Sequence, residues 1–246
     1  MNGKQVIVVA VDGPAASGKS TVSRAVARTL GFNYVDSGAM YRTVTWKALE
    51  AGVNAEDPIA VVAMLRALKV HFKLADGEVR MLIEGVYPDK AIRDPRVTEK
   101  VSIVAAIPGV RQILVRYQRS LTEFGSMVME GRDIGSVVFP DTPHKFYLDA
   151  NPNVRAHRRA RDLEAMRVQA NQAGVAQELQ RRDKLDSTRQ TAPLQVAPGA
   201  TIVDNSEQSV DATAKIIVDH IRQQSSGLRS FGGAGFRRGS VGVKAD

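Results

Sequence analysis

Apolar and polar positions along the chain follow the alternating rhythm of an α/β protein. The β-branched apolar run Gln5–Val11 predicts a buried strand, which the polar turn beginning at Asp12 brings to an end. From Lys19 the apolar positions recur at helical spacing as far as Leu30, and Gly31 is a helix stop. Because a strand, a glycine-containing loop and a helix in this order form half of a βαβ unit, we expect a parallel sheet.

Segments of helical and strand periodicity continue to alternate up to residue 224. Further helices are expected at about Gly38–Leu49, Asp57–Leu68, Val110–Phe124, 152–170, 173–188 and 207–223. Further strands are expected at Met127–Glu130, Lys145–Leu148 and Thr201–Val203. Together these elements predict an α/β fold with a three-layer α/β/α core around a parallel central sheet.

Two segments depart from this alternation of helices and strands. The runs Val70–Leu74 and Val79–Ile83 alternate with a period of two around Asp76-Gly77, which predicts a hairpin. A hairpin between helices suggests a small inserted subdomain over about 70–100, with an extra meander on the main sheet as the alternative. From Ser225 the chain is rich in Gly, Ser and Arg, so we expect one domain over 1–224 and a disordered tail over 225–246.

The composition narrows the function classes. The 246 residues contain no cysteine, which excludes disulfides and thiolate metal sites. The N-terminus has no secretory pattern and the run Val6–Val11 is too short to span a bilayer, so we expect a soluble, cytoplasmic protein with no membrane partner. The formal net charge of +8 indicates polyanionic partners, and nucleotide phosphates explain it as well as nucleic acid does.

The turn after the first strand fits the P-loop pattern of a glycine, four residues, and then glycine, lysine and a hydroxyl residue. The expected ATP-binding residues are Gly13, Pro14, Ala15, Ala16, Ser17, Gly18, Lys19, Ser20 and Thr21. The glycines allow backbone N–H groups to face phosphate oxygens at the head of a helix, Lys19 supplies charge for the β- and γ-phosphates, and the Ser20 hydroxyl can ligate Mg²⁺. An ordinary glycine turn is the alternative, and the flanking strand and helix decide against it.

A P-loop alone does not name a reaction, because kinases, GTPases and ATPases all use one. The sequence shows no convincing apolar strand ending in Asp followed by Glu, and no Asn-Lys-x-Asp motif of the type that reads guanine. Arginines instead recur near Asp and Ser. Such clusters suit phosphoryl transfer, where catalysis is mostly positioning and neutralisation of charge.

Four motifs together resemble those of the bacterial cytidylate kinases, which are P-loop nucleoside monophosphate kinases. The motifs are Asp12–Thr21, Asp36–Arg42, Glu130–Pro140 and Arg182–Arg189, and the resemblance covers about residues 5 to 224. It implies a P-loop kinase fold with a nucleoside-monophosphate-binding insertion and an arginine-rich lid over about 152–170. It also implies a monomer that uses ATP and Mg²⁺ to phosphorylate cytidine monophosphate and deoxycytidine monophosphate, with no specific nucleic-acid partner.

The resemblance also assigns roles to residues. Those implied to bind the acceptor nucleotide are Ser37, Arg42, Ser102, Arg111, Arg132, Asp133, Arg182, Asp186 and Arg189. Those implied to carry catalytic charge are Lys19, Arg132, Arg158 and Arg189, with Arg158 taken from the lid stretch Arg155–Arg161. Taken singly, these residues have ordinary alternatives: a helix N-cap for Ser37, and solvated helix faces or structural ion pairs for the charged side chains.

Base reading is the most specific of the implied roles. Ser102, Arg111 and Asp133 match positions that read the pyrimidine, and a carboxylate can accept from the cytosine amine while serine and arginine donate to the ring acceptors. Other readings stay open: a P-loop kinase for uridylate, thymidylate or shikimate, and an RNA-binding P-loop protein suggested by the basic tail around 232–239.

Overall fold

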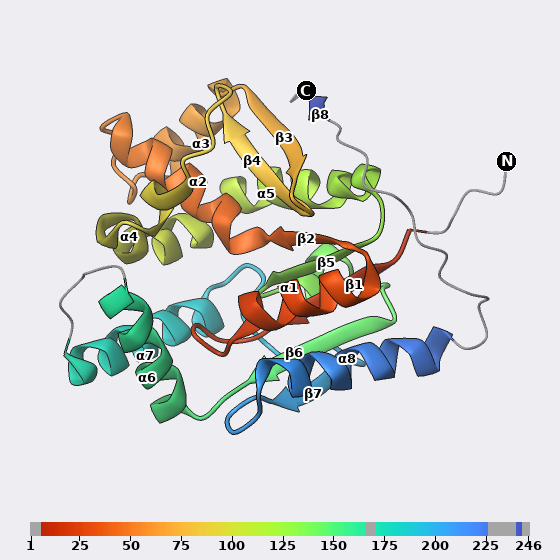
Figure 1. Cartoon of the computed structure of the whole chain (residues 1–246). Helices are drawn as coiled ribbons and strands as arrows, with labels where there is room; N and C mark the ends of the chain where they lie inside the picture. The colour runs from red at the N-terminus through yellow and green to blue at the C-terminus, as the bar shows by residue number, and fades with distance from the viewer. Residues whose placement is uncertain (1–5, 166–170, 226–239, 243–246) are drawn as a thin grey trace, which may run out of the picture.

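The computed structural model of the chain describes residues 6–165, 171–225 and 240–242 and confirms the α/β fold (Figure 1). Its strands are β1 (Val8–Asp12), β2 (Asn33–Asp36), β3 (Val70–Ala75), β4 (Glu78–Ile83), β5 (Met127–Gly131), β6 (His144–Asp149), β7 (Thr201–Asp204) and β8 (Ser240–Gly242). Within the described residues they form one sheet in the order β7-β6-β1-β5-β2-β4-β3-β8. The strands from β7 to β4 in this order pair in parallel, whereas the pairs at the β3 edge are antiparallel.

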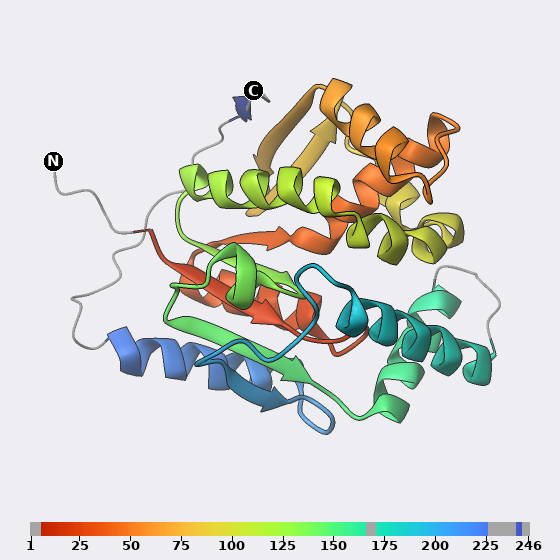
Figure 2. The same ribbon diagram turned by 180° about the vertical axis from the view of Figure 1, so that it is seen from behind.

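Helices cover both faces of the sheet, as Figures 1 and 2 show from opposite sides. One face carries α1 (Lys19–Leu30) and α8 (Val210–Ser225). The other face carries α2 (Ser37–Glu50), α3 (Pro58–Ala67), α4 (Pro95–Ala106) and α5 (Pro108–Ser120). Two further helices, α6 (Pro152–Ala165) and α7 (Gln172–Thr188), pack together beside the P-loop, and the short helices are η1 (Asp89–Arg93), η2 (Leu121–Phe124) and η3 (Ile134–Val138).

The central strand β1 is buried on both faces, which explains its continuous apolar sequence. Val9 and Val11 point into the core beneath α1 and α8, whereas Val8 and Ala10 point into the core beneath α2 to α5. The strand therefore ends at a fixed place between the two helical layers. That place is where the P-loop begins.

The β3–β4 hairpin lies at one edge of this sheet and is joined to β2 by a single parallel pair, Tyr34 with Glu78. Its inward side chains belong to the same core as α2 to α5, and the Phe72 ring meets the Tyr117 ring of α5 edge-on at 5.6 Å between centroids. The hairpin is thus hydrogen-bonded to the main sheet, as the meander alternative expected. The division into a domain over 1–224 and an inserted subdomain over 70–100 stays a prediction.

Helix α4 is absent from the elements expected from the sequence. Its first turn is capped by Asp94, whose Oδ1 accepts from the Arg96 N–H at 2.8 Å, and Pro95 occupies the first helical position. The same Asp-Pro start at Asp57 was the signal that predicted α3, so the missed signal was present. Of the predicted lid, 152–165 forms α6, and residues 166–170 lie outside the described part of the chain.

Removing residues 225–246 is expected to leave the turnover number and the melting temperature close to those of the full chain. Within the described residues, the removed segment contains Ser225, the last residue of α8, and Ser240–Gly242, which form three pairs with the edge strand β3. Residues 226–239 and 243–246 lie outside the description. A segment with few large apolar side chains has little to bury. Thermal denaturation and an ADP-release assay on both forms check this. A loss of several degrees would show that the tail packs on the core, and a loss of turnover would favour the RNA-binding alternative.

Candidate active site

A cleft of about 610 Å³ opens at the carboxyl ends of the parallel strands β1, β5 and β2. This edge is where the open sheets of α/β proteins bind their ligands. Its walls come from the P-loop, the start of α2, the turn after β5, helix α4 and the helices α6 and α7. The cleft therefore collects residues from nearly the whole length of the chain.

The P-loop needs glycine at both of its glycine positions. Gly13 has φ 151°, and a Cβ there would lie 2.2 Å from the Leu148 carbonyl oxygen. Gly18 has φ 93°, and a Cβ there would lie 2.5 Å from Asn205 Nδ2. The backbone can thus follow this path past β6 and β7 only without side chains, and it places the N-terminus of α1 at the cleft.

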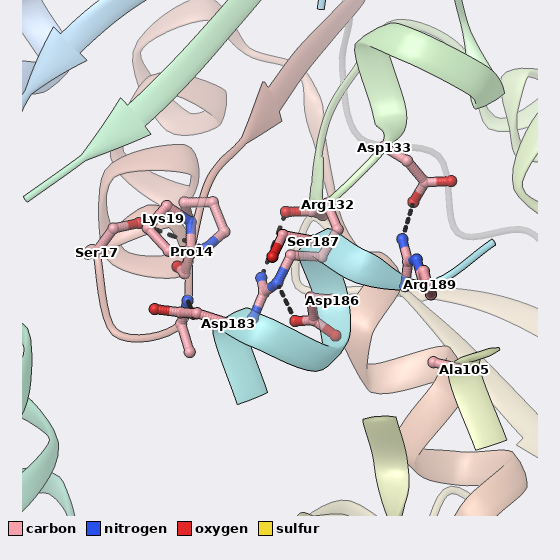
Figure 3. Close-up of polar contacts among 12 residues, drawn as sticks. Pro14, Ser17, Lys19, Ala105, Arg132, Asp133, Asp183, Asp186, Ser187 and Arg189 are labelled. Carbon is pink, nitrogen blue, oxygen red and sulfur yellow. Dashed lines mark hydrogen bonds and ion pairs between the residues drawn. The ribbon is translucent and has the colours of Figure 1, made fainter. Parts of the chain in front are cut away.

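Lys19 is folded back across the loop that precedes it. Its side-chain Nζ donates to the Pro14 carbonyl oxygen at 2.6 Å and to Ser17 Oγ at 3.4 Å (Figure 3). Burial and the nearby positive charge of Arg132 lower the pKa of Lys19 to about 7. Two neutral oxygens are poor partners for a buried ammonium, so an anion in the cleft would satisfy Lys19 better than the loop does.

All nine predicted acceptor-binding residues line this one cleft. At its inner end, the buried Arg111 guanidinium pairs with the Asp133 carboxylate. Arg189, which Figure 3 shows beside Asp133, has its Nη2 3.6 Å from the other oxygen of this carboxylate. Arg111 also donates to the Ala105 carbonyl oxygen at 3.2 Å. Two cations therefore fix the orientation of Asp133, with Ser102 on the wall beside them.

Ser37 does not cap α2. The N-cap is Asp36, whose Oδ1 accepts from the Ala39 N–H at 2.8 Å, so the capping alternative for Ser37 is wrong. The Ser37 hydroxyl instead donates to the Glu130 carbonyl oxygen at 2.6 Å. This bond ties the start of α2 to the end of β5 at the floor of the cleft.

Several arginines meet in the middle of the cleft. Burial and the charge of Arg182 lower the pKa of Arg42 to about 9, and burial and the charge of Arg132 lower the pKa of Arg182 to about 10. Arg132 Nε donates to Asp186 Oδ2 at 2.8 Å (Figure 3), and although burial opposes it, this pairing holds the pKa of Asp186 below its usual range. Like charges held this close favour an anion between them.

Helix α6, which forms most of the predicted lid, contacts the P-loop through its arginines. Arg158 donates to the Asn205 carbonyl oxygen at 2.7 Å and to the Ser17 carbonyl oxygen at 3.3 Å, and it lines the cleft. Arg159, another arginine of the predicted lid stretch, lines the cleft as well. Arg155 donates to the P-loop carbonyl oxygen of Ala15 at 3.2 Å and forms an ion pair with Asp183.

Glu130 is the most informative residue that the sequence reasoning missed. It lies one residue before the end of β5, beside Val11 of β1, and is buried at the cleft floor. Burial together with the charge of Asp36 raises the pKa of its carboxyl group, while the nearby Ser20 hydroxyl acts in the opposite direction. The signal in the sequence was the apolar strand Met127–Glu130, which ends in a single carboxylate. A search for an Asp-Glu pair does not find it.

Asn205 was also missed, because nothing in its local sequence marks it. It follows β7, and its Nδ2 donates to the Ser17 carbonyl oxygen at 2.8 Å while its Oδ1 accepts from the Thr213 hydroxyl at 2.8 Å. The side chain therefore ties the P-loop to α8. Only the topology, which brings these segments together, reveals that contact.

Asp12 gives the stability of the protein a predicted pH dependence. Its two carboxylate oxygens accept from the backbone N–H groups of Ile134 and Gly135, each at 2.8 Å, and burial raises its pKa from 3.8 to about 6. Because the folded-state pKa is the higher one, its contribution is full below pH 3.8 and is lost as the pH rises through about 6. Between these limits the wild type should lose about 3 kcal/mol of unfolding free energy relative to Asp12→Asn.

Urea denaturation of the wild type and of Asp12→Asn across this pH range measures that difference. The matched control is Asp141→Asn, which makes the same chemical change at an exposed position. We expect the control to follow the wild type at every pH. Parallel curves for wild type and Asp12→Asn would show that folding does not raise the pKa of Asp12.

Comparison with known proteins decides the family. The family model described as cytidylate kinase matches residues 9–223. The chain belongs to the cytidylate kinase family. Membership confirms the resemblance read from the four motifs and makes the chain a transferase of the nucleoside monophosphate kinase class.

Individual relatives agree over most of the chain. A cytidylate kinase from Lactiplantibacillus plantarum is 43% identical over 229 residues, covering 91% of this chain and 98% of the relative. One from Caldanaerobacter subterraneus is 39% identical, covering 90% and 97%. A bifunctional pantoate ligase/cytidylate kinase from Synechococcus sp. WH7803 is 45% identical over 87% of this chain, which spans 44% of that longer protein.

Among solved structures, a gluconokinase from Sinorhizobium meliloti 1021 is 13% identical with a TM-score of 0.48, covering 92% of this chain and 97% of that one. That likeness is too weak to carry an argument. Within the described residues, no helix has the length and apolar character needed to cross a membrane.

Proposed function

We propose that this cytidylate kinase family member transfers the γ-phosphoryl group of ATP to cytidine monophosphate and to deoxycytidine monophosphate. The observation that carries the proposal is a single cleft with the P-loop on one wall and the Arg111–Asp133–Arg189 cluster at its inner end. A nucleotide bound at each end brings the two phosphate groups together near Lys19 and Arg132.

Base recognition follows from the chemistry of the inner end. The Asp133 carboxylate accepts a hydrogen bond from the cytosine amine, while Arg111 and Ser102 donate to the ring nitrogen and carbonyl acceptors. Uracil carries a carbonyl in place of the amine, which faces Asp133 with no proton between the two oxygens. A buried site of this kind discriminates strongly.

The arginines hold the phosphates in line for transfer. Arg42, Arg132 and Arg182 hold the acceptor phosphate, while Asp186 accepts from a ribose hydroxyl and Arg189 contacts the sugar and phosphate. An oxygen of that phosphate attacks the γ-phosphorus, and the bond from this phosphorus to the bridging oxygen of ADP breaks. The acceptor is already an anion, so the step needs no general base. Lys19 and Arg158 balance the charge that moves to the leaving ADP.

The residues beside the P-loop fit a divalent cation. The Ser20 hydroxyl at the head of α1 and the buried Glu130 carboxylate both line the cleft, and oxygen ligands of these types suit Mg²⁺. When bound, the ion neutralises charge on the transferring and leaving phosphate oxygens. Ser20 and Glu130 would hold it against the nucleotide.

The test is a coupled assay of ADP release with purified protein, ATP, Mg²⁺ and each common nucleoside monophosphate in turn, with shikimate as a further acceptor. We expect cytidine and deoxycytidine monophosphates to give the highest catalytic efficiencies. A preference for uridylate, thymidylate or shikimate, or no turnover with any acceptor, would overturn the proposal. The proposal also describes a cytoplasmic monomer whose partners are these small molecules, which sedimentation and localisation experiments check.

A further inference from the structure

Tyr34 lies behind the cleft floor, on β2 next to β5, and is almost completely buried. Its hydroxyl donates to Glu130 Oε1 at 2.5 Å. A tyrosine hydroxyl in a core needs a polar partner, and here the partner is the carboxylate that also contacts Ser20. The tyrosine is therefore one residue removed from the predicted cation site.

The tyrosine ring is itself held in place from the other side. The Arg24 guanidinium lies over the Tyr34 ring, 4.1 Å from its centroid. Arg24 in turn makes a two-bond contact with Glu78, at 2.8 and 3.3 Å. Since β2 also pairs with the hairpin at Glu78, the ring has little freedom to swing away from Glu130.

Glu130 needs such a partner because its other neighbours do not fix the orientation of its carboxylate. Its charged neighbours are Lys19, whose Nζ donates to Pro14 and Ser17 instead, and the like charge of Asp36. A carboxylate with one oxygen accepting from a rigid hydroxyl cannot rotate about its last bond. Residues that orient a carboxylate near a metal in this way typically change the metal affinity 10- to 100-fold when they are removed.

We propose that Tyr34 is a positioning residue that orients Glu130 toward Ser20 and so sets the affinity of the enzyme–nucleotide complex for its divalent cation. The inference rests on the proposed use of a metal–nucleotide substrate. Tyr34 is not among the residues that line the cleft. Removing the Tyr34 hydroxyl should therefore lower the affinity for the divalent cation. It should leave the affinities for metal-free nucleotide and for cytidine monophosphate unchanged.

Tyr34→Phe tests this, because it removes the hydroxyl and keeps the ring beneath Arg24. The first readout is the affinity of Mn²⁺ for the enzyme–ADP complex, measured by electron paramagnetic resonance, and we expect it to fall about tenfold. The second is the Mg²⁺ concentration that gives half-maximal turnover at saturating ATP and cytidine monophosphate, which should rise by a similar factor. The matched control is Tyr117→Phe, which removes the hydroxyl of another buried tyrosine, packed against Phe72 away from the cleft.

Unchanged Mn²⁺ affinity in a folded Tyr34→Phe protein would overturn the proposal, and so would an equal fall in Tyr117→Phe. A double-mutant cycle with Glu130→Gln adds a second check: the tyrosine substitution should have little further effect once the carboxylate is gone, and additive effects would contradict the coupling. The Mn²⁺ measurement uses ADP without an acceptor. The Tyr34 inference can therefore fail while wild-type cytidylate phosphorylation stands, and an inactive wild type would instead sink the proposed function.

Discussion

Lys19→Ala is expected to reduce the turnover number by at least about a thousandfold, because the β- and γ-phosphates lose their mobile positive partner. The backbone cradle is expected to persist, since Gly13 and Gly18 set its path and Lys19 contributes only a contact to the Pro14 carbonyl oxygen and a longer one to Ser17. The effect should therefore appear in turnover more than in the fold. A coupled assay at saturating ATP and cytidine monophosphate measures it.

Stability separates this effect from unfolding. Burial lowers the pKa of Lys19 to about 7, which means that its surroundings in the folded protein disfavour the charged form, so Lys19→Ala should melt at or above the wild-type temperature. The control is Lys215→Ala, which removes an exposed lysine from α8. It should match the wild type in both measurements. Turnover within tenfold of wild type in folded Lys19→Ala would remove the P-loop assignment.

The parts of the fold that were predicted correctly are those with strong local signals. The strand, loop and helix from β1 to α1 carry periodicity, two obligatory glycines and a helix stop at Gly31, all within about 25 residues. Helix α4 was missed although its Asp94-Pro95 start is a recognised signal, because the preceding hairpin had already been read as one insertion. Local sequence signals determine which helices and strands form. How the hairpin joins the sheet depends instead on a pair distant in sequence, Tyr34 with Glu78.

The residues of the candidate site, too, could be predicted from the sequence only where the local signal is strong. The P-loop residues can be found from spacing alone, and the acceptor residues could be found only through the family resemblance, since residues such as Ser102 and Arg111 lie on helices that look ordinary. Glu130 and Asn205 show the limit: each acts through a contact with a segment distant in sequence, Asn205 with Ser17 and Glu130 with Ser20. No pattern within a short window encodes such a pair.

Asp133→Asn is expected to lower the preference for cytidylate over uridylate by at least about tenfold. The amide is neutral and can present either its N–H or its oxygen, so the repulsion that excludes uracil is relieved while the charge-assisted bond to the cytosine amine is lost. Losing a hydrogen bond to a charged group costs about 1.5 to 3 kcal/mol. The measurement is the ratio of kcat/KM for the two monophosphates at saturating ATP, in wild type and variant.

Asp133→Asn should also destabilise the protein. The ratio of the two kcat/KM values, however, does not depend on the fraction of protein that is folded. Arg111 is buried beside Asp133, and leaving a buried cation unpaired costs on the order of 3 to 5 kcal/mol, so the melting temperature should fall. Both substrates are assayed on one preparation, however, so a smaller folded fraction cancels. Asp186→Asn is the matched control, because this carboxylate pairs with Arg132 and is proposed to hold the ribose, which both substrates share. Asp186→Asn should lower kcat/KM for both monophosphates by the same factor. If Asp133→Asn also lowers both by the same factor, Asp133 positions the site and does not read the base.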